Sequence, residues 1–473
     1  GIQNTAIGTK ALFCNTTANN NTALGYNSLL NNTTGAENVA VGGEALYANT
    51  TANHNIAIGK KAMFDNTTGA NNVSIGSSSL ENNTTAASNT AVGFCSMKFN
   101  TTGASNTAIG TSALAANTTG GANVAVGVCS LDSNTTGDNN VAIGFLAMDK
   151  NTSGAAHVAI GRCALACNTT ANENTAVGFS ALCANTTGGD NVALGRGALQ
   201  SNTTGANNVA IGKDSLQANT TSSRNTAVGR EALLTQTTGD ANTAFGDLAL
   251  KRTTTGGLNV GIGAESLQTM TTGSRNTGLG RASAESLTTG SCNTAIGYAA
   301  GDNITTGLRN VMIGTQTHPS AADGTDQSVI GFDLGGKGND TFTAGGTGGV
   351  FNENNTTAWQ QTSDRRIKKN IVDNNIGLDK INQIQVRNFE YRTLDEITDF
   401  GESKKAAVVN VKGVQIGAIA QEIEKVLPEL VITQSTGVKT VNPDKLTWYM
   451  INAIKELKAE NDSLKTRIEA LES

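Results

Sequence analysis

A glycine recurs at every seventeenth position through most of this chain, and the apolar and polar positions around it repeat with it. The series begins at Gly8, Gly25 and Gly42 and continues to Gly331, which makes 20 repeats without an insertion or a deletion. One extra residue would turn every later side chain to the opposite face, so each repeat must be one equivalent rung of a stack. The pattern predicts a mainly β fold, with a parallel β-solenoid (a β-roll) over residues 1–331.

Two short strands are predicted in each rung. The residue before the glycine is always apolar and the residue three before it is β-branched in 19 of 20 rungs, as in Thr5 and Ile7. Side chains alternate along a strand, so these two share a face, which we expect to line the interior. Ala6, between them, is then expected to face outward. A second strand is expected at pairs such as Ala11 and Leu12, which would complete a thin aliphatic interior.

Asparagine occupies two further columns, a column being one position followed through successive rungs. It stands four residues before the glycine in 18 of 20 rungs, with His157 and Gln327 as exceptions. A second column opens an Asn-Thr-Thr or Asn-Thr-Ser turn from Asn15 to Asn219. Asparagine tolerates positive φ, and its amide bonds nearby backbone. We interpret both columns as structural ladders and not as catalytic or metal-binding groups.

Stacked strands lie about 4.8 Å apart, so 20 rungs form a rod about 95 Å long. A rung of this length encloses a very slim core, and we expect several chains to pack side by side. The Asn-x-Ala-Ile-Gly pattern resembles the repeats in the heads of trimeric autotransporter adhesins, whose left-handed β-rolls pack as trimers. The resemblance implies a homotrimer. Those repeats are shorter, and an intertwined triple β-helix remains an alternative.

The composition changes near residue 363. Residues 363–473 carry 17 Lys+Arg and 17 Asp+Glu in 111 positions, whereas residues 1–362 carry 16 and 21. The glycine-rich stretch 332–362 is predicted to be a neck, and 363–473 a small α+β unit.

The net charge of −5 comes without a basic stripe, which argues against a nucleic acid partner. No run of about 18 apolar residues predicts membrane insertion. The seven cysteines include no Cys-x-x-Cys pair, so we expect no metal site, and we expect no cofactor.

Several motifs follow one another in the C-terminal unit. They are Ser363-Asp364-Arg365-Arg366-Ile367-Lys368, Gly417-Ala418-Ile419-Ala420-Gln421-Glu422-Ile423, Leu427-Pro428-Glu429-Leu430-Val431 and Ala453-Ile454-Lys455-Glu456-Leu457. Together they resemble the self-cleaving intramolecular chaperone that ends phage endosialidase tailspikes and other phage tail fibres. The resemblance implies a domain that assembles trimers and then cuts itself off.

By the same resemblance the scissile bond joins Thr362 to Ser363, with Ser363 as the nucleophile and Lys368 as its general base. A serine hydroxyl attacks poorly until a base takes its proton, and a lysine serves as that base only when its pKa is lowered. The alternative is that Ser363 caps a helix and Lys368 is solvated. The chain is therefore at most a single-turnover serine autoprotease, and no activity on an external substrate is expected.

The chain ends in a predicted helix with a heptad seam, from about residue 446. The seam residues are Met450, Ile454, Leu457, Asn461, Leu464, Ile468 and Leu471. Apolar residues at spacings of four and three are typical of a coiled coil, and a lone Asn461 in the seam fixes register. A core-facing amphipathic helix is the alternative.

These features favour a homotrimeric phage tail fibre that attaches the virion to a host cell-surface receptor, a glycan or an envelope protein. Such a fibre is made in the host cytoplasm and acts outside the cell. One alternative is a structural spacer whose binding part precedes Gly1, and another is a bacterial surface adhesin. A glycan-degrading spike is disfavoured, because the rungs contain no grouped pair of carboxylates.

Overall fold

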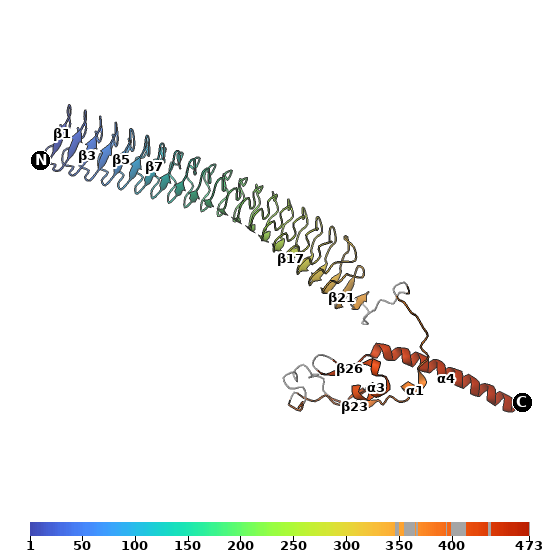
Figure 1. The fold of residues 1–473 in the computed structure, drawn as a ribbon. Helices are drawn as coiled ribbons and strands as arrows, with labels where there is room; N and C mark the ends of the chain where they lie inside the picture. Colours follow the sequence, from blue (N-terminus) through green and yellow to red (C-terminus); the bar gives the residue numbers. More distant parts are fainter. Residues whose placement is uncertain are drawn as a thin grey trace. The chain divides into compact units, whose positions relative to one another are not determined.

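The computed structural model describes residues 1–345, 350–353, 365, 368–393, 395–398, 413–433 and 437–472. The chain divides into two compact units, Gly1–Thr362 and Ser363–Ser473, and each is described by itself. In Figure 1 the first unit is a long stack of rungs and the second carries the longest helix.

The first unit is a ladder of short parallel strands, which confirms the predicted solenoid. Each strand pairs with the equivalent strand of the next rung, as Thr5 with Thr22. The strands are β1 (Thr5–Ile7), β2 (Thr22–Leu24), β3 (Val39–Val41), β4 (Ile56–Ile58), β5 (Val73–Ile75), β6 (Thr90–Val92), β7 (Thr107–Ile109), β8 (Val124–Val126), β9 (Val141–Ile143), β10 (Val158–Ile160), β11 (Thr175–Val177), β12 (Val192–Leu194), β13 (Val209–Ile211), β14 (Thr226–Val228), β15 (Thr243–Phe245), β16 (Val260–Ile262), β17 (Thr277–Leu279), β18 (Thr294–Ile296), β19 (Val311–Ile313) and β20 (Ser328–Gly331).

Parallel pairing continues past residue 331, into the stretch predicted as a neck. Strand β21 (Thr341–Gly345) pairs parallel with β20, with Ser328 opposite Phe342, so this last rung is shorter than the others. Strand β22 (Val350–Glu353) then pairs antiparallel with β21. The reversal of direction ends the parallel ladder.

The face of each strand that points into the core is the opposite of the predicted one. Ala23, in the middle of β2, is fully buried, while Leu24 beside it is 43% exposed. The same holds along the ladder, where the central residue of each strand from β2 to β20 is buried and neither flanking residue of β1–β20 is. Buried Leu or Met side chains from the opposite wall, such as Leu29 and Met63, fill the interior. Opposite a buried leucine or methionine, a coil this slim has room for little more than a methyl group on the strand side.

The predicted second strand is also wrong, because the backbone there is left-handed and not extended. Leu12 and Leu29 have φ values of 54° and 50°. The rung-to-rung hydrogen bonds persist nevertheless, since the N–H of Leu29 donates to the carbonyl of Ala45 over 3.0 Å. This wall of the coil is therefore a column of stacked turns that points its leucine and methionine side chains inward.

Both asparagine ladders are confirmed. In the first, the backbone N–H of Asn38 donates to Oδ1 of Asn21 over 2.9 Å. In the second, Nδ2 of Asn49 donates to Oδ1 of Asn32 over 2.8 Å. His157 keeps its place in the first ladder, because its Nδ1 accepts the backbone N–H of Asn174 over 3.1 Å.

The second unit is a small α+β domain around the start of one long helix. Its elements are α1 (Leu378–Ile381), β23 (Arg387–Phe389), β24 (Gln415–Gly417), α3 (Ala420–Val426), the 3-10 helix η3 (Pro428–Leu430), β25 (Val431–Thr433), β26 (Lys439–Val441) and α4 (Pro443–Glu472). Strands β23 with β24 and β25 with β26 form two antiparallel pairs. Ile423, Leu427, Leu430 and Tyr449 form its buried core.

Candidate functional site

The candidate catalytic residues predicted from the sequence lie near the start of the second unit. Thr362 and Ser363 lie outside the described residues, so the scissile bond and the nucleophile remain predictions. Lys368 is described: its side chain is exposed, and its backbone N–H donates to the carbonyl of Arg365 over 3.2 Å.

The heptad seam is uncovered on the last helix. Tyr449 and Ala453, near the start of α4, are buried within the unit. The seam residues are exposed to different degrees, namely Met450 49%, Ile454 65%, Leu457 54%, Leu464 54%, Ile468 54% and Leu471 86%. A core-facing helix would bury such residues. The seam therefore presents an apolar stripe that the single chain leaves in water.

Three contacts anchor the beginning of α4. Nδ2 of Asn452 donates to the carbonyls of Asn374, at 2.6 Å, and Ile376, at 3.2 Å. The backbone N–H of Leu378, the first residue of α1, donates to Oε2 of Glu456 over 2.7 Å. These bonds fix only the part of the helix that precedes the exposed leucines.

A fourth anchor is the hydroxyl of Tyr449, which donates to the Glu429 carboxylate. This hydrogen bond stabilises the ionised carboxylate, and it holds the pKa of Glu429 below its usual range and raises the pKa of Tyr449. The bond ties η3 to α4, because Glu429 belongs to η3.

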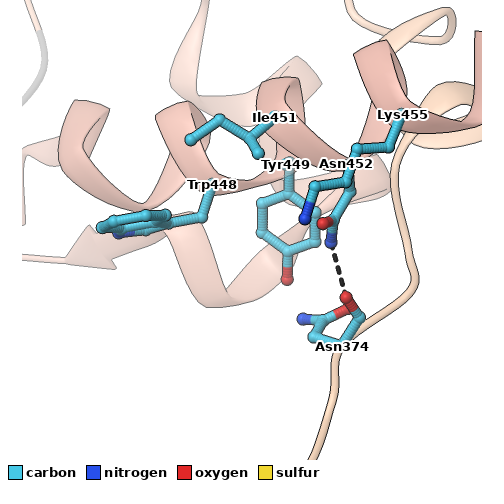
Figure 2. Close-up of a pocket in the computed structure, with 6 residues that line it drawn as sticks. All are labelled: Asn374, Trp448, Tyr449, Ile451, Asn452 and Lys455. Carbon is cyan, nitrogen blue, oxygen red and sulfur yellow. Dashed lines mark hydrogen bonds between the residues drawn. The ribbon is translucent and has the colours of Figure 1, made fainter. Parts of the chain in front are cut away.

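A shallow pocket lies along the same stretch of α4. Figure 2 shows its lining residues, which are Asn374, Trp448, Tyr449, Ile451, Asn452 and Lys455. The Asn452 amide is already bonded to the Asn374 carbonyl, and Lys455 supplies the one ionisable amine. The six lining residues include no carboxylate, thiol or imidazole.

The described residues contain no cluster of three or more His, Cys, Asp or Glu side chains that could hold a metal ion. None of their helices is long and apolar enough to cross a membrane.

In the first unit, aromatic and cationic residues alternate at the position directly after the glycine that recurs every 17 residues. Phe145, Arg162, Phe179 and Arg196 occupy this column in four successive rungs, and all four are exposed. The Arg162 guanidinium lies 5.9 Å from the Phe145 ring centroid and 5.5 Å from that of Phe179, and Arg196 lies 6.0 Å from Phe179. Our sequence analysis missed this series; aligning the residue after each glycine would have found it.

The fold and the exposed seam define the class of protein to which this chain belongs. It is a parallel β-solenoid shaft followed by a small domain, which ends in a helix with an uncovered apolar seam. Residues 363–432 match the protein family described as chaperone of endosialidase. No curated protein sequence matches the chain. The match confirms the resemblance noted for the C-terminal unit, and it ends before α4.

Proposed function

We propose that this chain is the subunit of a homotrimeric fibre, in which the C-terminal unit assembles three copies and the solenoid forms the shaft. The observation that carries the proposal is the match of residues 363–432 to an assembly chaperone, together with a helix after strand β26 that has an exposed heptad seam.

The shaft itself explains why such a chaperone is needed. Its 20 rungs are nearly identical, so two chains can associate with an offset of one rung and lose only the contacts of the terminal rungs. Long-range strand pairing is slow and leaves edges exposed while it proceeds. A clamp at the C-terminus aligns the chains at one end, and the shaft assembles from there.

The seam of α4 supplies the clamp. Burying one leucine side chain contributes about 1.5–3 kcal/mol, so six seam positions in each of three helices provide ample driving force. Asn461 lies within the seam and is exposed in the single chain. A polar residue at one seam position favours one register and one strand number over the alternatives.

Native mass spectrometry of the full chain tests this proposal. With Ser363→Ala present to block the cut proposed below, the chain is expected to have the mass of three chains, and adding Leu457→Lys with Leu464→Lys is expected to yield single chains. Lys465→Ala changes a neighbouring residue of α4 that is outside the seam, and it should leave the trimer intact. A mass of one chain for Ser363→Ala alone at micromolar concentration would overturn the proposal.

We further infer that the chain cuts itself before Ser363. In this step neutral Lys368 takes the proton of the Ser363 hydroxyl, whose oxygen attacks the carbonyl carbon of Thr362. Lys368 then gives that proton to the backbone nitrogen of Ser363 as the C–N bond breaks, which leaves an ester between Thr362 and the Ser363 side chain. Water then hydrolyses the resulting ester and restores the hydroxyl. Support comes from the family match, which begins at residue 363.

Denaturing electrophoresis tests the cut. The wild type should give two fragments, Gly1–Thr362 and Ser363–Ser473, which coincide with the two compact units. Ser363→Ala should give one intact band, whereas Ser463→Ala, an exposed serine on α4, should still give two. One intact band from the wild type would show that the domain acts as a chaperone without cutting.

For the shaft we propose attachment to an anionic polymer of a host cell surface, as part of a virion outside the cell. The Phe145 to Arg196 series supports this, because among the described residues no salt bridge joins Arg162 or Arg196 to a carboxylate. Aromatic rings two rungs apart lie about 9.6 Å apart along the shaft, which is close to the length of a disaccharide.

Binding of the purified trimer to dextran sulfate tests the attachment surface. Arg162→Gln with Arg196→Gln is expected to weaken binding at least tenfold, while Arg275→Gln, an exposed arginine in another column, should change it little. Equal binding by both variants would leave the shaft as a spacer. A bacterial surface adhesin would bind the same polymer, so binding does not distinguish it from a phage fibre. Detecting the protein in virions or on a bacterial surface does.

A further inference from the structure

The outward face of the strand ladder carries no charge. Each rung places two side chains on it, three residues and one residue before the glycine, which makes 40 positions in 20 rungs. None is Asp, Glu, Lys, Arg or His; they are Val, Ile, Leu, Thr, one Phe and one Ser. These side chains are accessible in the single chain, as shown by Leu194 at 46% exposure and Phe245 at 56%.

The two outward columns that flank the strand face include charged residues. The position after the glycine includes exposed Lys60, Arg162 and Arg230, and the position five before it includes exposed Glu37 and Arg224. The strand face is thus free of charge, although the columns on both sides of it are not. The exposed threonine column that includes Thr34 and Thr51 is uncharged too, but it is hydroxylic, whereas the strand face is mainly aliphatic. Proteins usually place charges on β surfaces that must stay in water, since an uncharged one invites association.

The size of this face matches a protein interface. Twenty strands at about 4.8 Å make it about 95 Å long, and three residues of strand make it about 10 Å wide, which gives roughly 950 Å². The largest apolar patch on a typical monomer is about 300–600 Å². A stable interface buries about 800 Å² on each partner.

We propose that this face, the strands β1–β20, packs against the same face of other copies of the chain, with rungs in register. A partner that covers the whole face must present apolar groups at the rung spacing without interruption over 20 rungs. The strand face of a second copy of this chain presents apolar groups at that spacing. The proposal rests on the homotrimer proposed above and specifies which surface of the shaft the chains share.

The packing has a geometric consequence. Copies related by a rotation axis parallel to the shaft carry equal residues at equal height. Ile211, at the end of β13, therefore lies near Ile211 of its neighbours. Asn207, four residues earlier in the same rung, is exposed on a turn with φ of 59° and points to another side.

Disulfide cross-linking of the full-length chain tests the proposal. Ile211→Cys is the test variant, and Asn207→Cys is the matched control, since Cys292 already occupies that column in another rung with φ of 60°. Neither change alters a buried side chain, and circular dichroism checks that both variants keep the wild-type spectrum. After mild oxidation, non-reducing denaturing electrophoresis should show a covalent dimer for Ile211→Cys, at least fivefold above the wild-type background.

The outcomes separate this proposal from the homotrimer itself. If native mass spectrometry finds three chains and Ile211→Cys cross-links no more than Asn207→Cys or the wild type, the shared face is wrong and the trimer stands. If Ser363→Ala is a single chain, both proposals fall. Selective cross-linking of Ile211→Cys supports the strand face as the interface.

Discussion

Nδ2 of Asn117 donates to Oδ1 of Asn100, one rung earlier, over 2.7 Å, and also to the carbonyl of Gly120 over 2.9 Å. Each amide of this buried column thus closes its own turn and links two rungs. Farther along the shaft, Met270 and Leu287 occupy the same column and are fully buried. The apolar residues of this column, Met270, Leu287 and Ile304, lie in three successive rungs.

Asn134→Leu isolates one apolar side chain within the amide ladder. Oδ1 of Asn117 loses its donor. The carbonyl of Gly137 keeps only the bond from Nδ2 of Asn123, and Nδ2 of Asn151 keeps only its bond to the carbonyl of Gly154. Each buried polar group left unpaired costs about 1–3 kcal/mol. The midpoint of guanidinium unfolding should fall clearly, whereas Leu287→Met, within the apolar run, should shift it little. Equal shifts would contradict the ladder's role.

Gly144→Ala is expected to break the shaft locally. Gly144 has φ of 138°, and an added Cβ would lie 2.6 Å from the carbonyl oxygen of Gly161. The strained backbone alone costs about 1–3 kcal/mol, and the clash adds to it. Gly43→Ala is the control, because a Cβ there meets nothing within 4 Å. Faster proteolysis of Gly144→Ala than of Gly43→Ala is the expected result; equal rates would argue against this geometry.

His157 makes the stability of the shaft depend on pH. Burial lowers the pKa of its imidazole below the usual 6.5, so the unfolded chain binds a proton that the folded chain does not. Stability is therefore full above about pH 6.5 and falls as the pH drops below it, by about 1.4 kcal/mol per unit until the folded pKa is reached. Unfolding measured between pH 5 and 7.5 should show this loss.

Two variants check the origin of that loss. His157→Asn restores the amide that neighbouring rungs use, as Asn140 donates to the carbonyl of Gly154, and it should remove most of the dependence. His54→Asn changes an exposed histidine that pairs with Glu37, and it should leave the dependence in place. If the stability of His157→Asn falls at low pH as it does in the wild type, other groups cause the loss.

Tyr449→Phe should loosen the start of α4. It removes the hydroxyl that donates to the Glu429 carboxylate, and because Glu429 is exposed, the loss should be only about 1 kcal/mol. Because the hydrogen bond lowers the pKa of Glu429, it stabilises the folded chain above pH 4.5, and this stabilisation is lost as the pH falls through the pKa of Glu429 in the folded chain. The variant lacks this pH-dependent stabilisation. Hydrogen exchange at the start of α4 reports the change. Trp448→Phe, 69% exposed, should leave exchange unchanged.

The repeat period and the identity of each column are local properties of the sequence, and they predicted the rungs, the parallel pairing and both amide ladders. The motifs around Gly417 and Leu427 likewise identified the C-terminal domain. The geometry of the predicted Ser363 and Lys368 pair did not follow, because no spacing in a sequence shows which groups a fold desolvates.

The sequence alone determined that Thr22 and Leu24 share one face of a strand and that Ala23 takes the other, since alternation is a property of the extended backbone. Only the tertiary structure decided which face is inside. The left-handed turns at Leu29 and its equivalents drive large side chains across the slim coil, so small residues, mostly Ala, fit opposite them. A larger residue, Met312, is buried where the turn carries Ala300 and Gly301 instead of a leucine. The larger aliphatic side chains are left outside, where the single chain cannot bury them.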